Sequence, residues 1–251
     1  MLSERVAREK AAYDEGDVYA NSHALQTRYS HVFRCPNSQH AEQHLDRLVA
    51  ESAENRDILD YGCLDGAMTP RYLEMKPRSI AGIDISTNGV ARANANWGHA
   101  ARFSVGDVHC MPFPDRSFDV VVGRSILHHL ELPLAYKEIL RVLRPGGRAI
   151  FMEPLGDNPG AKILRAVTPA TRTKDEKALS RSDIDQADSL FAGSCHLFFN
   201  LVSVPAAMLT SLTPLRPDNL LLRIADQFDR RLARTPLKYW MRSVVLCWRA
   251  G

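Results

Sequence analysis

The 251-residue chain contains few cysteines, and none of them lies in a metal-binding pattern. No Cys-x-x-Cys pair and no Cys/His spacing indicates a zinc site. An odd, widely scattered set does not form a disulfide framework, so we expect reduced thiols and a cytoplasmic setting. The five are Cys35, Cys63, Cys110, Cys195 and Cys247.

The chain also lacks long apolar segments. Residues 1–5 are charged, so no secretory signal is expected. Residues 189–215 contain no Asp, Glu, Lys or Arg, but Pro205, Pro214 and many polar residues interrupt the run. We therefore expect no membrane span there. One interpretation is a buried antiparallel strand over 195–204 with apolar loop, and the other is an apolar lid over a lipophilic substrate.

Neither sign of charge dominates the chain, since the net charge is only +3. That balance does not indicate nucleic-acid binding. The Asn/Asp-Pro-Pro-Tyr/Phe and Pro-Cys motifs of base methylation are missing as well, so no nucleic-acid partner is expected. Residues 216–251 carry eight Lys or Arg against three Asp. This local excess is either a solvated basic face or a peripheral contact with an anionic membrane or acidic substrate.

Strand and helix patterns alternate through the middle of the chain. Short apolar runs predict strands at 57–61, 79–84, 102–105, 118–123 and 148–153. Helices are predicted at 67–74, 87–97 and 133–143. Right-handed crossovers between parallel strands give a doubly wound α/β sheet. Polar helices are expected over 3–31, with a break at Asp14-Glu15-Gly16. Ser38 is expected to cap a helix with an apolar stripe, and Asp218 to cap a later helix. A closing strand is expected at 243–248.

An acidic, glycine-bearing turn follows the first predicted strand, as Asp60-Tyr61-Gly62-Cys63-Leu64-Asp65-Gly66. The second strand ends on Asp84. This order of strand, glycine turn, helix, strand and acid is typical of a site for an adenosine-containing cofactor. Glycine lets the backbone approach the ligand, and the acid can accept hydrogen bonds from ribose hydroxyls.

Four ordered blocks carry a family resemblance. The turn at 60–66 resembles motif I of class I S-adenosylmethionine-dependent methyltransferases, although Leu64 stands where that family usually has glycine. The blocks at 106–121, 125–130 and 143–148 are similar to the ubiquinone-biosynthesis-like (methyltransferase type 11) branch. The resemblance covers roughly residues 10–154. It implies a Rossmann-like, mostly parallel sheet of about seven strands with an antiparallel last strand, N-terminal helices and an insertion after strand five.

The resemblance also implies the cofactor, S-adenosylmethionine, with S-adenosylhomocysteine as product. It assigns Asp84 to the ribose, Asp107 to the adenine amino group and Ile85 to packing on the adenine. Tyr29 is expected to close over the cofactor. The expected cofactor-binding residues are Tyr29, Asp60, Gly62, Cys63, Gly66, Asp84, Ile85, Asp107, Val108 and Arg124.

Catalytic residues are harder to identify, because methyl transfer from a sulfonium mainly requires alignment of the reacting atoms. A base is needed only when the nucleophile must lose a proton. His128 and His129 follow the fourth strand, and a neutral imidazole is a competent base. Both are candidate catalytic residues, with a structural role as the alternative. No carboxylate cluster indicates a metal, and none is expected.

We expect a helical cap over 1–52, a cofactor-binding core over 53–154, and a substrate-shaping insertion with C-terminal elements over 155–251. Leu221, Ile224, Ala225, Phe228 and Leu232 form one helical face, which either packs on the domain or lies on a membrane.

The expected function is methylation of O, N or C in a small, largely apolar biosynthetic metabolite. The alternative is a degenerate cofactor-binding domain acting as a non-catalytic partner or regulator. A nicotinamide-dependent oxidoreductase fits poorly, because Gly-x-Gly-x-x-Gly is missing. The oligomeric state is not indicated.

Overall fold

The computed structural model describes residues 4–15, 24, 26–159, 162 and 173–251. The helices are α1 (Glu4–Glu15), α3 (His31–Arg34), α4 (Pro36–Ala53), α5 (Thr69–Glu74), α6 (Thr87–Trp97), η1 (Leu127–His129), α7 (Leu132–Val142), α9 (Arg181–Leu190), α10 (Ser203–Thr210), α11 (Leu220–Leu232) and η3 (Pro236–Trp240). The strands are β1 (Asp57–Tyr61), β2 (Ser79–Asp84), β3 (Arg102–Val105), β4 (Phe118–Arg124), β5 (Leu143–Pro154), β6 (Gly193–Phe199) and β7 (Ser243–Arg249).

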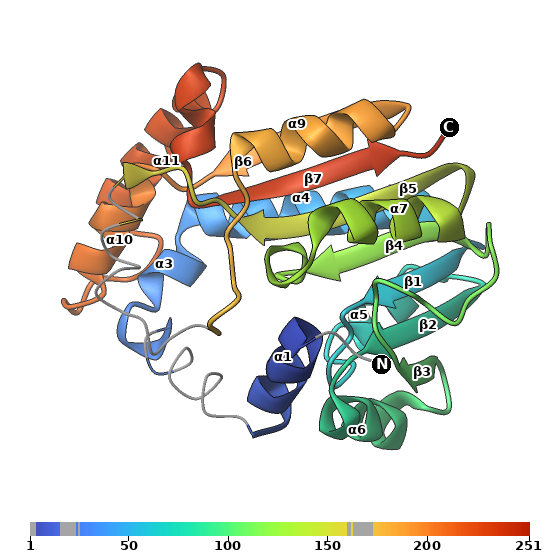
Figure 1. The fold of residues 1–251 in the computed structure, drawn as a ribbon. Coiled ribbons are helices and arrows are strands. Elements are labelled where there is room, and N and C mark those ends of the chain that lie inside the picture. The colour runs from blue at the N-terminus through green and yellow to red at the C-terminus, as the bar shows by residue number, and fades with distance from the viewer. Residues whose placement is uncertain (1–3, 16–23, 25, 160–161, 163–172) are drawn as a thin grey trace.

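The seven strands form one sheet in the order β3-β2-β1-β4-β5-β7-β6 (Figure 1). The pairs among β1 to β5 are parallel, and β7 runs antiparallel to both β5 and β6. The expectation of a doubly wound, mostly parallel sheet with an antiparallel last strand is confirmed. The order reverses between β1 and β4, where such sheets bind ligands at their carboxyl edge.

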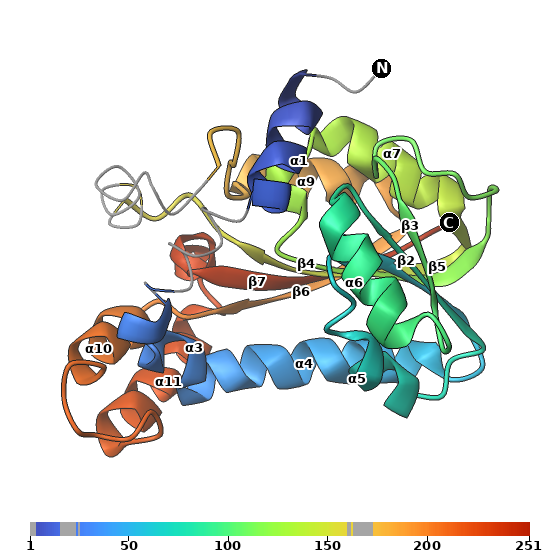
Figure 2. The same cartoon turned by 90° about the horizontal axis from the view of Figure 1, so that it is seen from below.

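Helices cover both faces of the sheet, with α4 and α5 on one side and α1, α7 and α9 on the other (Figure 2). Successive side chains of β1 pack against helices on opposite faces of the sheet. Ile58 packs in the cluster with Leu45 of α4, while Leu59 packs in the cluster with Ile139 of α7. Because successive strand residues point to opposite faces, a strand buried on both sides reads as one apolar run.

The prediction for 195–204 was wrong in extent and in burial. β6 ends at Phe199, and most of its residues are exposed because it is an edge strand. Asn200 then takes a φ of 70°, which turns the chain. The buried Asp229 carboxylate accepts the backbone N–H groups of Val202 (2.6 Å) and Ser203 (3.1 Å), so α10 begins where a strand was expected.

Two predicted helix starts also need correction. α4 begins at Pro36, and Ser38 lies inside its first turn, donating to the Val32 carbonyl instead of capping the helix. The N-cap of α11 is Asn219, whose side chain accepts from the Leu222 N–H at 3.2 Å. Asp14 and Glu15 of the predicted break belong to α1, and Gly16 lies outside the described residues, as do residues 160–161 and 163–172 of the predicted insertion after strand five.

Within the part of the chain that is described, no helix has the length and apolar character that crossing a membrane requires.

Candidate active site

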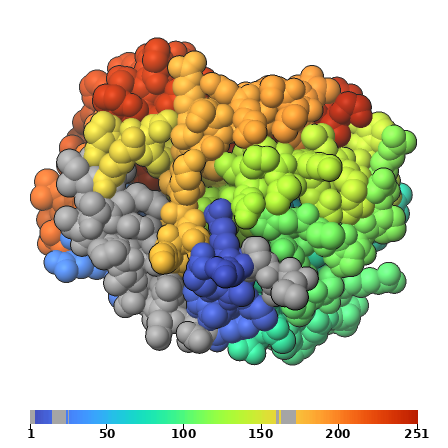
Figure 3. Space-filling view, in the orientation of Figure 1, coloured from blue at the N-terminus to red at the C-terminus, as the bar shows by residue number. Residues whose placement is uncertain are grey.

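A cavity of about 510 Å³ opens at the carboxyl edge of β1, β2 and β4. Helix α1 lies across the face of the molecule in front of it, as the space-filling view shows in dark blue (Figure 3). Polar contacts hold this helix in place. Lys10 donates to the Ile85 carbonyl at 3.1 Å, and Arg8 pairs with Asp175 at 2.8 Å. The site therefore has a sheet edge as its floor and a polar-anchored helix as its cover.

The glycine turn has the conformation that its sequence requires. Gly62 and Gly66 have φ values of 81° and 73°, which side-chain-bearing residues rarely adopt. A Cβ on Gly62 would lie 2.9 Å from Cγ1 of Ile126. The Gly62 and Cys63 N–H groups both donate to the Ile83 carbonyl, at 2.9 and 3.1 Å, which fastens the turn to β2. Cys63 is buried beside this turn, and burial raises the pKa of its thiol.

Leu64, the departure from the family pattern, is accommodated by a second glycine. Its backbone is left-handed, with a φ of 42°. A Cβ on Gly89 of α6 would lie 3.0 Å from Cδ1 of Leu64, so the missing side chain at Gly89 makes room for the leucine. The Leu64 N–H still donates to Oδ2 of Asp84 at 2.9 Å. The turn thus keeps its contact with the ribose-binding candidate.

Asp84 is buried and fixed by backbone donors on both oxygens. Oδ1 accepts from the Ser86 N–H at 2.8 Å, and Oδ2 accepts from Leu64. Burial raises the pKa of this carboxyl, and the two backbone bonds oppose that effect. Each oxygen retains a further lone pair, so the carboxylate can also accept from two ribose hydroxyls.

Asp60 is a buried carboxyl without a neutralising partner among the described residues. Its side chain is buried, and Oδ2 has no hydrogen-bond partner among the described residues. Burial, with the nearby Asp84 charge adding to it, raises its pKa to about 7. A buried carboxylate without a partner is costly unless a positive group neutralises it. The sulfonium and ammonium of S-adenosylmethionine are such groups, so the residues present fit the expected cofactor.

Asp107, the residue expected to meet the adenine, is held by a neighbouring histidine. Oδ1 of Asp107 accepts from the N–H and the ring Nδ1 of His109, at 2.9 and 2.7 Å. These bonds lower the pKa of Asp107. Its other oxygen is thereby available to an adenine amino group. Ile85 and the buried Val108 also line the cavity.

His128 is held by a buried carboxylate at the end of β5. Its Nδ1 lies 2.7 Å from Oε2 of Glu153, while Oε1 accepts the N–H groups of Ile126 (2.9 Å) and Leu127 (3.0 Å). Glu153 is 1% exposed and His128 is 6% exposed. With the carboxylate accepting from Nδ1–H, Nε2 carries the lone pair, and the ring lines the cavity.

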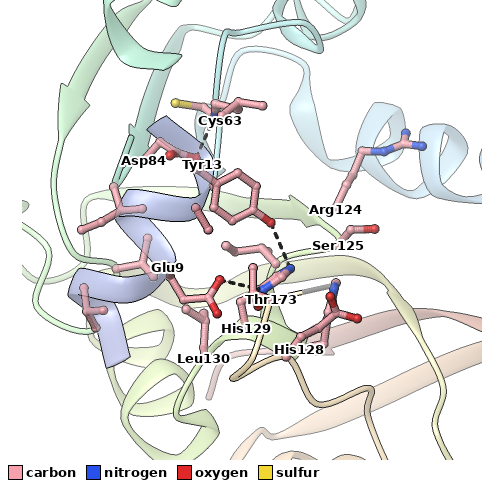
Figure 4. A pocket seen from close by; sticks show the side chains of 18 of the residues that line it. Glu9, Tyr13, Cys63, Asp84, Arg124, Ser125, His128, His129, Leu130 and Thr173 are labelled. Carbon is pink, nitrogen blue, oxygen red and sulfur yellow. Dashed lines mark hydrogen bonds and ion pairs between the residues drawn. The ribbon is translucent and has the colours of Figure 1, made fainter. Parts of the chain in front are cut away.

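His129 has both ring nitrogens engaged by α1 (Figure 4). Nε2 lies 3.0 Å from the Tyr13 hydroxyl, and Nδ1 lies 3.1 Å from Oε2 of Glu9. Burial raises the pKa of Tyr13, which keeps its hydroxyl a donor. Burial, the largest single effect, opposes ionisation of Glu9, but the contacts with His129 and Thr173 together outweigh it and the pKa of Glu9 is lowered. His129 therefore ties the covering helix to the sheet.

One group of side chains has spacing that a metal ion can use. Ligand atoms of His128, His129 and Glu176 all lie within 4.8 Å of one another. Nε2 of His129 is hydrogen bonded to Tyr13, its Nδ1 is paired with the Glu9 carboxylate, and Nδ1 of His128 is held by Glu153. We interpret the group as a hydrogen-bond network.

Two predicted residues lie apart from the others. The Arg124 guanidinium turns toward α4 and pairs with Glu42, although Arg124 also borders the cavity (Figure 4). Tyr29 lies outside the cavity, packed on the cluster of Val32, Cys35, Ala207 and Leu222. Its surroundings are those of a packed side chain, the alternative to closing over the cofactor. Tyr13 of α1 lines the cavity.

Sequence reasoning missed Glu9 and Tyr13, and it did not pair Glu153 with His128. Glu9 and Tyr13 are four residues apart, which places them on one face of a helix. That spacing was a usable signal once the helix was predicted. Their contacts with His129 join residues that are more than a hundred positions apart in the chain, so no local sequence pattern predicts them.

Comparisons with known proteins agree with this geometry. A family model described as "Methyltransferase domain" matches residues 59–151. The O-methyltransferase cnsE of Penicillium expansum is 31% identical over 165 residues, covering 58% of this chain and 60% of that protein. The 27-O-demethylrifamycin SV methyltransferase of Amycolatopsis mediterranei is 37% identical over 122 residues, covering 44% of this chain and 45% of that protein. The matches span less than two thirds of either relative.

A solved structure supports the fold. Geranyl diphosphate C-methyltransferase from Streptomyces coelicolor A3(2), in complex with Mg²⁺, geranyl diphosphate and S-adenosyl-L-homocysteine, matches with a TM-score of 0.58. The match has 14% identity and covers 85% of this chain and 81% of that one.

Proposed function

The central part of this chain is a class I S-adenosylmethionine-dependent methyltransferase domain, and we propose that the protein methylates a hydroxyl oxygen of a small, largely apolar acceptor. His128 is the general base in this proposal, and Glu153 positions it. The observation that carries the proposal is the buried contact of 2.7 Å between Nδ1 of His128 and Oε2 of Glu153.

Different residues of the site bind different parts of the cofactor. Asp84 holds the ribose, Asp107 the adenine, and Asp60 faces the positive end of the cofactor. When bound, S-adenosylmethionine supplies an electrophilic methyl group on a sulfonium, which is a good leaving group. The glycine turn allows the backbone to come close to it, and α1 covers the site.

A base that can remove a proton from the acceptor favours an oxygen acceptor. A hydroxyl is a weak nucleophile until a base removes its proton, and Nε2 of His128 has the lone pair for that step. As the proton arrives, the ring becomes positively charged, and the buried Glu153 carboxylate stabilises that charge. Two relatives named as O-methyltransferase and 27-O-demethylrifamycin SV methyltransferase support the same choice.

The acceptor is inferred to be largely apolar from the side chains around the cavity. Val6 and Ala12 of α1 line it, together with Met68, Ile126 and Leu130. Apolar walls with a few placed polar groups are the usual composition of a small-molecule site.

The test is turnover with a panel of hydroxylated apolar compounds, comparing the wild-type chain with His128→Gln. We expect kcat to fall about 10²–10⁴-fold in the variant, the range for loss of a general base, while cofactor affinity changes less than about threefold. His99→Gln, at an exposed histidine, is the matched control. Equal kcat values for His128→Gln and the wild type would remove the base from the proposal.

The comparisons give no support to the non-catalytic alternative. The absence of a nucleic-acid partner, the cytoplasmic setting and the boundaries at residues 52 and 154 remain predictions.

A further inference from the structure

Helix α11 presents a large apolar face to solvent. The residues that it buries are Leu222, Ala225, Asp226 and Asp229. Part of the face expected from its sequence points outward: Leu221, Ile224 and Phe228 are 47%, 43% and 50% exposed. Ala225 is buried and Leu232 packs against the core, so packing on the domain holds for only part of this face.

The apolar surface continues beyond α11. Helix α10 packs beside α11 at one end of the molecule (Figures 1 and 2). Leu209 of α10 is 64% exposed, Leu212 and Leu215 in the connection are 62% and 51% exposed, and Leu220 at the start of α11 is 74% exposed. We call the seven side chains the α10–α11 apolar face: Leu209, Leu212, Leu215, Leu220, Leu221, Ile224 and Phe228. Exposed apolar side chains gathered on two packed helices and their connection are typical of an interaction surface.

Two exposed arginines border this face among the described residues. Arg216 follows Leu215 directly, and Arg231 lies one helical turn beyond Phe228, on the same side of α11. Both are exposed, and neither forms an ion pair with any residue that the structure describes. The acids of this region are engaged: Asp218 pairs with Arg223, while Asp226 and Asp229 are buried.

We propose that the α10–α11 apolar face docks on a lipid bilayer containing anionic headgroups. An amphipathic helix with apolar residues on one side and arginines at the margin lies in the membrane interface, with its apolar side chains below the headgroups. A second copy of the chain is a poorer occupant, because a two-fold contact would bring the same unpaired arginines together.

Helix α11 is linked to the cavity wall through α4. Asn37 of α4 donates to Asp226, on the buried side of α11, at 2.7 Å, and Glu42, further along α4, pairs with the cavity-lining Arg124. The inference goes beyond methyl transfer and does not depend on it.

The experiment is flotation of the full-length protein with vesicles of phosphatidylcholine, with and without about 30% phosphatidylglycerol. Leu212→Gln combined with Phe228→Gln removes two exposed apolar side chains, and Leu134→Gln combined with Val105→Gln is the matched control at similarly exposed sites elsewhere. Arg216→Gln combined with Arg231→Gln tests the charged margin. Light scattering of each protein reports its oligomeric state.

We expect the wild type to float with anionic vesicles, and the apolar pair to bind about a hundredfold more weakly while the control is unchanged. The arginine pair should bind about tenfold or more weakly at low salt. Absence of wild-type binding, or equal loss in the control, would overturn the proposal. So would an oligomer that the apolar pair converts to a monomer without any vesicle binding, which would assign the face to a second copy.

Discussion

Asp60→Asn should make the protein without its cofactor more stable, and more so as the pH rises. The wild-type carboxyl is buried, Oδ2 lacks a partner among the described residues, and its pKa is raised from the ordinary 3.8 to about 7. A carboxyl whose pKa is higher in the folded than in the unfolded chain favours the folded state less as it ionises. The free-energy cost of ionising this buried carboxyl therefore grows between about pH 4 and pH 7 and is constant above that range.

The magnitude follows from the two pKa values. Linkage gives a cost that is about 2–3 kcal/mol larger at about pH 8 than at about pH 5. The asparagine amide is neutral at both pH values, so any fixed cost of burying its N–H groups cancels in the comparison. The free energy of unfolding of the variant, relative to wild type, should rise by that amount across this pH interval.

The assay is urea unfolding of both proteins at the two pH values, monitored by tryptophan fluorescence. Glu74→Gln removes the same formal charge from an exposed position and should show a much smaller pH dependence. Cofactor titration should show the opposite ranking, with Asp60→Asn binding S-adenosylmethionine at least about tenfold more weakly. If the two proteins keep the same stability difference at both pH values, the reasoning about a buried, unpartnered charge is refuted.

Three further substitutions test the local geometry. Gly62→Ala should lower the free energy of unfolding by about 2–4 kcal/mol, because the left-handed φ and the contact with Ile126 both oppose a side chain. Adding Ile126→Ala should restore only the part of that free energy that is due to the contact. Urea unfolding measures both variants, and full restoration would mean that φ is unimportant. Tyr13→Phe should accelerate cofactor release about 3–10-fold by removing the bond to His129, whereas an unchanged stopped-flow release rate would show that α1 does not depend on that bond. Asp229→Ala should cost about 2–4 kcal/mol through loss of the cap on α10, and a change in unfolding free energy below about 0.5 kcal/mol would contradict that role.

Much of the core was predictable because local chemistry determines it. β1 and β2 are buried on both faces, so their residues read as short apolar runs with sharp ends. Two of the three positive-φ positions in the turn after β1 are glycines, Gly62 and Gly66, and these are readable in the sequence; Leu64 is the third. The acids at the strand ends were predictable for the same reason, because parallel strands bring their carboxyl ends to one edge.

The sequence by itself therefore determined the sheet, the glycine turn and the acids that converge on the cofactor. Only the tertiary structure decided which partners those elements meet. β6 ends, and α10 begins, where pairing with Ser243 stops and Asp229 provides a cap. His128 acquires Glu153, and His129 acquires Tyr13, across separations that no local pattern encodes. The exposed side of α11 was decided in the same way: Asp226 and Asp229 are buried and bonded to neighbouring elements, while Leu221, Ile224 and Phe228 face the solvent.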